Sequence, residues 1–260
     1  MKRSPSITSK LPPVLGLAAV LAIWLIASEG GLVPEFMLPS PAQVGAALVS
    51  EFPTLLANAS VPLQEAALGL CIGVAVGFVF AVAMDAFELL YKIFYPILVI
   101  TQTIPTVAIA PLLVLWFGYE MTPKVILVVL VTFFPVTVGL LDGFRGVDPD
   151  AVGLLRSMGA GRWQIFRYLK CPWALPQFFS GLRIAAAYSI VGAVISEWLG
   201  GFGGLGVYMT RVKKAFAFDK MFAVIFLISA LSLALMALVG WLELRCMPYR
   251  SVDEEKRRNK

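Results

Sequence analysis

Four polar side chains interrupt a long apolar run in this sequence. The segment TQTIPTVAIAP carries Thr101, Gln102, Thr103 and Thr106 around Pro105. A proline removes a backbone donor from a helix, and backbone groups freed inside lipid must find partners or line a wet cavity. These side chains can form hydrogen bonds with a solute, so we interpret the four polar residues as lining a translocation path. For the threonines, hydroxyl groups bonded to carbonyls of their own helix explain the pattern equally well.

The sequence offers no catalytic constellation. Histidine is absent, and Cys71, Cys171 and Cys246 are too far apart to indicate a metal knuckle. We therefore predict no enzymatic activity, no metal site and no cofactor. The phosphate-binding motif G-x-x-x-x-G-K-[ST] does not occur either, so any ATP would have to be bound and hydrolysed by a partner polypeptide.

The composition is that of a membrane protein. Of 260 residues, 59% are hydrophobic and 14% are charged, and the mean hydropathy is +0.85. A soluble domain carries about a quarter charged residues. A helical span needs about 20 apolar residues. We predict an all-α polytopic protein with one transmembrane domain over 1–260 and six spans, near 11–28, 62–84, 92–117, 124–142, 177–199 and 221–243.

The distribution of Lys and Arg predicts the orientation. With the N-terminus inside, 15 of the 21 Lys and Arg residues lie on the cytoplasmic side. Because cytoplasmic loops are enriched in these residues, we expect both termini in the cytoplasm of a bacterial cell, with the chain in its plasma membrane. The cluster Arg211, Lys213 and Lys214 falls outside and opposes this rule, and the sequence alone gives no account of it.

A basic segment over 148–172 separates the fourth and fifth spans. Asp148 is suited to cap a helix whose first residue is Pro149, and Gly159 is suited to end it. A second short helix is predicted over 161–170. The simpler interpretation of this segment is a basic amphipathic helix that lies on anionic lipid headgroups.

Two prolines follow that second helix. Pro172 and Pro176, in CPWALP, are predicted to break it before the fifth span begins. The segment as a whole therefore reads as two short helices in a cytoplasmic loop, and its sharper interpretation is a docking element for a cytoplasmic partner.

Residues 150–187 resemble the EAA loop of bacterial ABC-importer permeases. Gly159-Ala160 matches the Gly-Ala of that loop, RWQIFRYL matches its following helix, and the two prolines match its exit. The chain departs from the pattern at Gly153-Leu154-Leu155, which replaces Glu-Ala-Ala, and at Cys171, which replaces a Leu. The resemblance implies a type I permease core and a loop that docks on an ATPase, with the coupling residues Asp150, Leu154, Leu155, Arg156, Gly159, Ala160, Trp163 and Phe166.

The resemblance extends over about residues 35–245. VPEFMLPSPAQVGAAL and IPTVAIAPLLVLWFG are similar to the nitrate, sulfonate and taurine permeases, a group that includes permeases for thiamine-pyrimidine precursors. It implies alternating access, two cytoplasmic ABC ATPase subunits, an extracytoplasmic solute-binding protein and no nucleic acid. From the small number of spans we predict a homodimer. The expected solute is a thiamine pyrimidine precursor, followed by a sulfonate, taurine or nitrate.

The alternative is a secondary transporter or channel with a lipid-surface helix at 149–170. Such a protein would need acidic residues or histidines in mid-membrane for its coupling ion. Only Glu65 and Asp85 come close, and both are expected near helix ends. Arg183, at the inner end of the fifth span, is expected to extend its side chain to the cytoplasmic interface.

Small residues repeat every four positions in two of the predicted spans. This spacing places them on one helical stripe, where they let helix backbones approach closely. We predict mainly packing within the chain, with contacts in a dimer as the alternative. The stripes comprise Gly69, Gly73 and Gly77 in the second span, and Gly181, Ala185 and Ser189 in the fifth.

Overall fold

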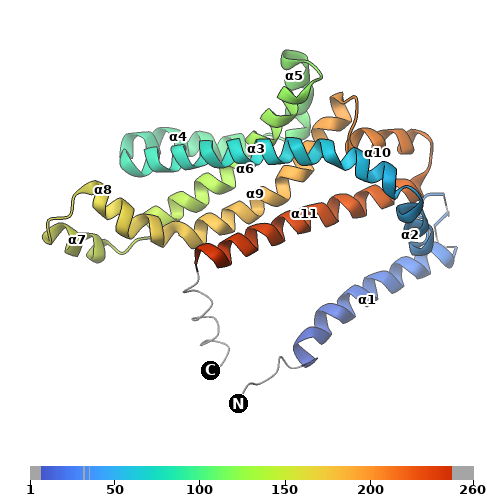
Figure 1. Ribbon diagram of the computed structural model, residues 1–260, viewed down its shortest axis with the longest axis horizontal. Helices are drawn as coiled ribbons and strands as arrows, with labels where there is room; N and C mark the ends of the chain where they lie inside the picture. The colour runs from blue at the N-terminus through green and yellow to red at the C-terminus, as the bar shows by residue number, and fades with distance from the viewer. Residues whose placement is uncertain (1–6, 32, 35, 248–260) are drawn as a thin grey trace. The chain divides into compact units, whose positions relative to one another are not determined.

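The computed structural model describes residues 7–31, 33–34 and 36–247, and every regular element in these ranges is a helix. The all-helical prediction is therefore confirmed for the described residues (Figure 1). A five-residue π-helical turn, Phe166–Lys170, joins two of the α-helices. In chain order the α-helices are α1 Ile7–Glu29, α2 Pro41–Ser50, α3 Phe52–Ala86, α4 Glu88–Thr101, α5 Thr106–Phe117, α6 Met121–Arg145, α7 Pro149–Ser157, α8 Arg162–Ile165, α9 Cys171–Gly200, α10 Leu205–Lys214 and α11 Phe218–Cys246.

Within the described residues, four helical stretches are long and apolar enough to cross a membrane: α3, α6, the stretch Arg162–Gly200 and α11. A fifth candidate is the pair α4 and α5, which passes the same test only when its two halves are taken together. The apolar part of α1, Val14–Glu29, is shorter than these. The chain is thus a multi-pass membrane protein, while the count of six spans stays a prediction.

The predicted span 92–117 is bent at its polar run. Its two halves, α4 and α5, meet at 98°. At the break, the N–H groups of Gln102 and Thr103 bond to carbonyls three residues back, at Val99 and Ile100, which tightens and ends α4. Pro105 then starts the next helix, because it has no N–H to continue the first one.

The predicted break at Pro172 and Pro176 is also wrong. Helical structure continues from Arg162 to Gly200 over 39 residues. The N–H of Cys171 donates to the carbonyl of Phe166, a π-type bond that ends the hydrogen-bond register of α8. Pro172 therefore falls in the first turn of α9, where a missing N–H is tolerated.

The described chain forms two compact units. The smaller comprises the described residues up to 58 together with 208–227, and the larger comprises 59–207 together with 228–247. In the smaller unit, Trp24 donates its indole N–H to the carbonyl of Pro39 at 3.0 Å. Its ring also stacks on Phe222 and Phe226, with centroids 6.0 and 5.8 Å away.

The larger unit is organised by backbone contact between α6 and α9. A Cβ atom on Gly181 would lie 2.3 Å from the carbonyl oxygen of Pro135, and one on Gly139 would lie 2.6 Å from the carbonyl oxygen of Gln177. Neither position has room for any side chain. Since lipid provides no hydrophobic drive for helices to associate, such close packing is what holds them together.

The small-residue stripe of α3 also packs against α6. Cβ atoms on Gly69 and Gly73 would meet side chains of α6 at 2.4 and 2.1 Å, and one on Gly77 would lie 2.9 Å from a carbonyl oxygen of that helix. In α9, Ala185 and Ser189 are completely buried. The structure thus places the α3 stripe, Gly181, Ala185 and Ser189 inside one chain rather than on an outer face.

Replacement of Gly181 by Leu is expected to destabilise the protein, because the side chain would have to displace the backbone of α6. Overpacking of this kind costs about 1–3 kcal/mol or more. The matched control is Gly45→Ala in α2, where a Cβ would meet nothing within 4 Å. The melting temperatures of the purified variants in detergent measure the effect. An unchanged value for G181L would contradict the close packing.

Candidate functional site

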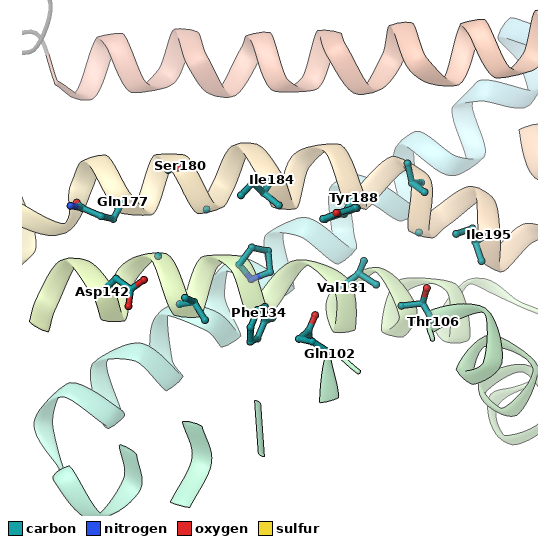
Figure 2. A pocket seen from close by; sticks show the side chains of 16 residues that line it. Gln102, Thr106, Val131, Phe134, Asp142, Gln177, Ser180, Ile184, Tyr188 and Ile195 are labelled. Atoms are coloured by element: carbon teal, nitrogen blue, oxygen red, sulfur yellow. The ribbon is translucent and has the colours of Figure 1, made fainter. Parts of the chain in front are cut away.

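A cavity of about 710 Å³ opens along the pair α6 and α9. Figure 2 shows Gln177, Ser180, Ile184 and Tyr188 following one another along α9, opposite residues of α6 that include Asp142. The lining positions on α9 recur at intervals of three and four, so one face of the helix forms this wall. The opposite face of α9 is buried in the larger unit.

The break between α4 and α5 closes one side of this cavity. Gln102 and Thr106 both line it, on either side of the break. Thr101 and Thr103 do not: their hydroxyls donate to the carbonyls of Leu98 and Ile100, at 2.6 and 2.8 Å. The structure therefore separates the four polar residues of the run, with two in the cavity and two bonded to their own helix.

The lining is largely apolar with a few polar groups. Asp142 is the charged member, and no Lys or Arg side chain belongs to the lining in the described residues. The aromatic rings of Phe134 and Tyr188 face the space, and the exposed fraction of Tyr188 is 54%. Such a surface suits a flat solute with hydrogen-bonding edges, whereas a bare anion would find a carboxylate and no counter-ion.

The first short helix predicted for the basic segment forms as expected, whereas the second one, 161–170, continues into α9. The carboxylate of Asp148 accepts the N–H of Asp150 at 2.9 Å and so caps α7. Gly159 follows α7 with φ of +86°, the left-handed value that favours glycine. The N–H of Ala160 returns to the carbonyl of Leu155 at 3.0 Å, which completes the helix end.

Large apolar side chains of this segment point to its surface. Leu154, Met158 and Trp163 are 64%, 75% and 72% exposed. Arg156 is exposed beside them, whereas Leu155 is half-buried. An exposed apolar patch flanked by basic residues is typical of a surface that binds a protein or a membrane.

Two contacts attach this segment to the spans. Lys170 Nζ lies 2.6 Å from Asp85 Oδ1, at the end of α3. The ring of Phe166 lies 5.2 Å from that of Phe144 in α6 and 5.8 Å from that of Trp163, centroid to centroid. A displacement of the segment would therefore act on α3 and α6 as well as on α9, which continues it.

A buried group of charges at the other end of the larger unit was missed by the sequence analysis. Lys124 Nζ lies 2.8 Å from Glu65 Oε1, and both side chains are almost completely buried. Glu65 lies well inside α3, so its expected place near a helix end is wrong. No local pattern indicates this pair, because its two residues are far apart in the sequence.

Glu197, at the end of α9, belongs to the same region. Its Oε2 accepts the N–H of Gly206 at 2.6 Å, in the first turn of α10. A Cβ on Gly204 would lie 2.0 Å from the Oε1 atom of Glu197. The glycine-rich turn over 200–206 is thus folded around this carboxylate, and α10 begins where the carboxylate can complement its positive end.

Arg183 has a partner that the sequence analysis did not predict. Its guanidinium forms an ion pair with Glu243 of α11. The side chain is thus anchored to a neighbouring helix rather than extended to the lipid interface alone.

Comparison with known proteins identifies the family. Residues 73–247 match the family model described as "Binding-protein-dependent transport system inner membrane component". The chain is 37% identical over 232 residues to a probable ABC transporter permease protein of Haemophilus influenzae, covering 89% of this chain and 95% of that protein. It is 36% identical over 251 residues to the formylaminopyrimidine transport permease ThiX of Halalkalibacterium halodurans, covering 96% and 99%.

A solved structure supports the fold. The inward-facing MetNI methionine ABC transporter matches with a TM-score of 0.57 at 17% identity, covering 71% of this chain and 90% of that one. More distant relatives include permeases named for riboflavin, aliphatic sulfonates, taurine and nitrate.

The chain belongs to the inner-membrane permeases of binding-protein-dependent ABC importers. It is a transport subunit and not an enzyme, and such a permease works with a separate ATPase and a solute-binding protein. The predicted family is therefore confirmed, and the alternative of a secondary transporter or channel is wrong.

Replacement of Lys124 by Met is expected to destabilise the protein, since Glu65 would be left buried without its counter-ion. Breaking one side of a buried pair costs about 3–5 kcal/mol, whereas replacing both sides with apolar residues is often neutral. Thermal unfolding of the purified single variant K124M and the double variant E65L/K124M measures this. A double variant no more stable than the single one would argue against the ion pair as the cause.

Proposed function

We propose that the cavity along α6 and α9 is one half of a solute path and that a second copy of this chain completes it. The observation that carries the proposal is the lining: Gln102 and Thr106 at the broken helix face Tyr188 and Gln177 on α9 across one space. Broken helices supply unpaired backbone groups, which in membrane proteins are tolerated where they line a cavity. The exposed rings and amides on this face are what a passing solute would contact.

The way in which the basic segment is attached supports alternating access. We infer that closure of two ATPase subunits moves the coupling residues around Leu154, Ala160 and Trp163. The ion pair of Lys170 with Asp85 and the ring contact of Phe166 with Phe144 carry this movement into α3 and α6. The missing Glu of the family loop leaves the exposed apolar side chains and Arg156 to make the contact with the ATPase.

The solute that fits best is a thiamine pyrimidine precursor. A pyrimidine can stack on Tyr188 or Phe134 and donate to the amide oxygen of Gln102, and further along the path its amino groups can donate to Asp142 and to the amide oxygen of Gln177. The relative named for formylaminopyrimidine supports this choice. Sulfonates, taurine and nitrate are the second candidates, because distant relatives are named for them. They fit less well because the lining offers an anion no cation.

Replacement of Ala160 by Asp is expected to uncouple transport without loss of the protein from the membrane. The added charge would lie in the contact with the ATPase, where an unpaired carboxylate must be desolvated. Solute uptake should fall by roughly tenfold or more, while the amount of membrane-inserted chain stays constant. Ala160→Ser is the control, since it adds a polar group of similar size at the same position without a charge. Normal uptake by A160D would remove the coupling role of this position.

Replacement of Ile184 by Cys is expected to allow cross-linking of two copies across the path. The background lacks Cys71, Cys171 and Cys246, and Leu233→Cys on α11, also well exposed, controls for random collisions. In cells with the complete transporter, an aminopyrimidine should slow the cross-link and taurine should not. The reverse order would favour the second class of solute, and no cross-link at all would argue against the shared path.

A further inference from the structure

Phe216 has a backbone conformation that its side chain disfavours. It is the one residue other than glycine with a positive φ, 55°, in the part of the chain that the structure describes. It lies just beyond α10, where Ala217 N–H donates to the carbonyl of Val212 at 3.0 Å and closes the helix end. Glycine is the usual residue at such a position, because a bulky side chain is strained there. Ending α10 therefore does not explain why the residue is Phe.

The ring of Phe216 is not used to build the interior. It is 73% exposed, and that of Phe36 is 63% exposed. Together with Phe218, whose ring meets that of Phe216 at 6.2 Å between centroids, they line a groove of about 350 Å³. Asp219 also lines the groove, where it complements the N-terminus of α11. Strain that presents an aromatic side chain to the surface points to a binding role.

Three cations lie next to this groove in sequence and in the same unit. Arg211, Lys213 and Lys214 occupy the last turn of α10 and are exposed, while Val212 between them is buried. Cations at a helix C-terminus complement its dipole, and that effect accounts for part of the pattern. In the predicted topology, however, they lie outside the cell, where loops of membrane proteins carry few such residues. A partner with acidic groups would account for the excess.

The basic helix end and the groove are held in place. Glu51, which follows α2, accepts a hydrogen bond from the hydroxyl of Tyr208 at 3.1 Å and pairs with Lys220 at 2.5 Å. The ammonium of Lys220 keeps the pKa of Glu51 below its usual range, while burial and this carboxylate raise the pKa of Tyr208 to about 12. One carboxylate thus joins α2 to α10 and α11 and gives the surface a fixed geometry.

We propose that Phe216, Phe36 and the cations of α10 form the docking face for the extracytoplasmic solute-binding protein. The partner would present acidic side chains to Lys213 and Lys214 and an apolar pocket to the ring of Phe216. The proposal rests on the outward position of α10 and on the importer function proposed above. An aromatic belt at the lipid interface is a weaker explanation, because rings on regular helices suffice for it and need no strained backbone.

The decisive variant is Phe216→Gly, because it separates binding from stability. Loss of the strain should leave the melting temperature of the transporter unchanged or higher, while loss of the ring should weaken binding roughly tenfold or more, as for other aromatic anchors. The probe is the purified cognate solute-binding protein of the same organism, titrated onto the complete transporter in nanodiscs. Phe216→Asn, which keeps the left-handed backbone without the ring, should show the same loss of affinity.

The charges are tested by the matched pair Lys213→Glu and Lys92→Glu, which change the net charge equally at two exposed positions. K213E should slow association and flatten its dependence on salt, while K92E, on the cytoplasmic side, should not. Unaltered affinity of F216G and K213E would overturn the docking face. If the unaltered transporter fails to bind that protein at all, the proposed function fails instead. Weaker attachment of F216G to anionic vesicles, with normal protein binding, would assign the face to lipid.

Discussion

The direct contact between the backbones of α6 and α9 is the constraint on which the rest of this structure depends. Gly139 and Gly181 leave no space for a side chain, so the two helices cannot separate or rotate without losing that contact. The same pairing directs Asp142 and Tyr188 toward one cavity, because each helix has only one face left for it. The same pair of helices therefore provides both the packing contact and a wall of the proposed solute path.

Ion pairs inside the larger unit join helices that have no hydrophobic drive to associate in lipid. The pairs Glu65 with Lys124, Asp85 with Lys170, and Arg183 with Glu243 each join different helices. Pairs of this kind are costly to break and specify which helices are neighbours. Glu197 similarly stabilises the glycine-rich turn that leads into α10, because its carboxylate accepts the N–H of Gly206. None of these carboxylates needs to bind a coupling ion, which agrees with a permease driven by a separate ATPase.

Local signals in the sequence predicted local structure well. Asp148 and Gly159 begin and end α7 as expected, because a helix cap depends on neighbours within a few residues. The family loop was recognised for the same reason. Pairing between distant positions was not predicted, because nothing in the residues around Lys124 indicates that Glu65 lies beside it. The prolines misled in both directions, since only the fold decides whether a helix bends, as at Pro105, or continues, as at Pro172.

The uninterrupted stretch from Arg162 to Gly200 has a mechanical consequence. A helix of 39 residues is roughly 58 Å long. Gly181, where it contacts α6 most closely, stands midway between its ends and is placed to serve as a fulcrum. A tilt of about 5° around that point would move the two ends by about 2.5 Å in opposite directions, given the length of the rod. A displacement of the basic segment would then move the turn around Glu197 in the opposite direction.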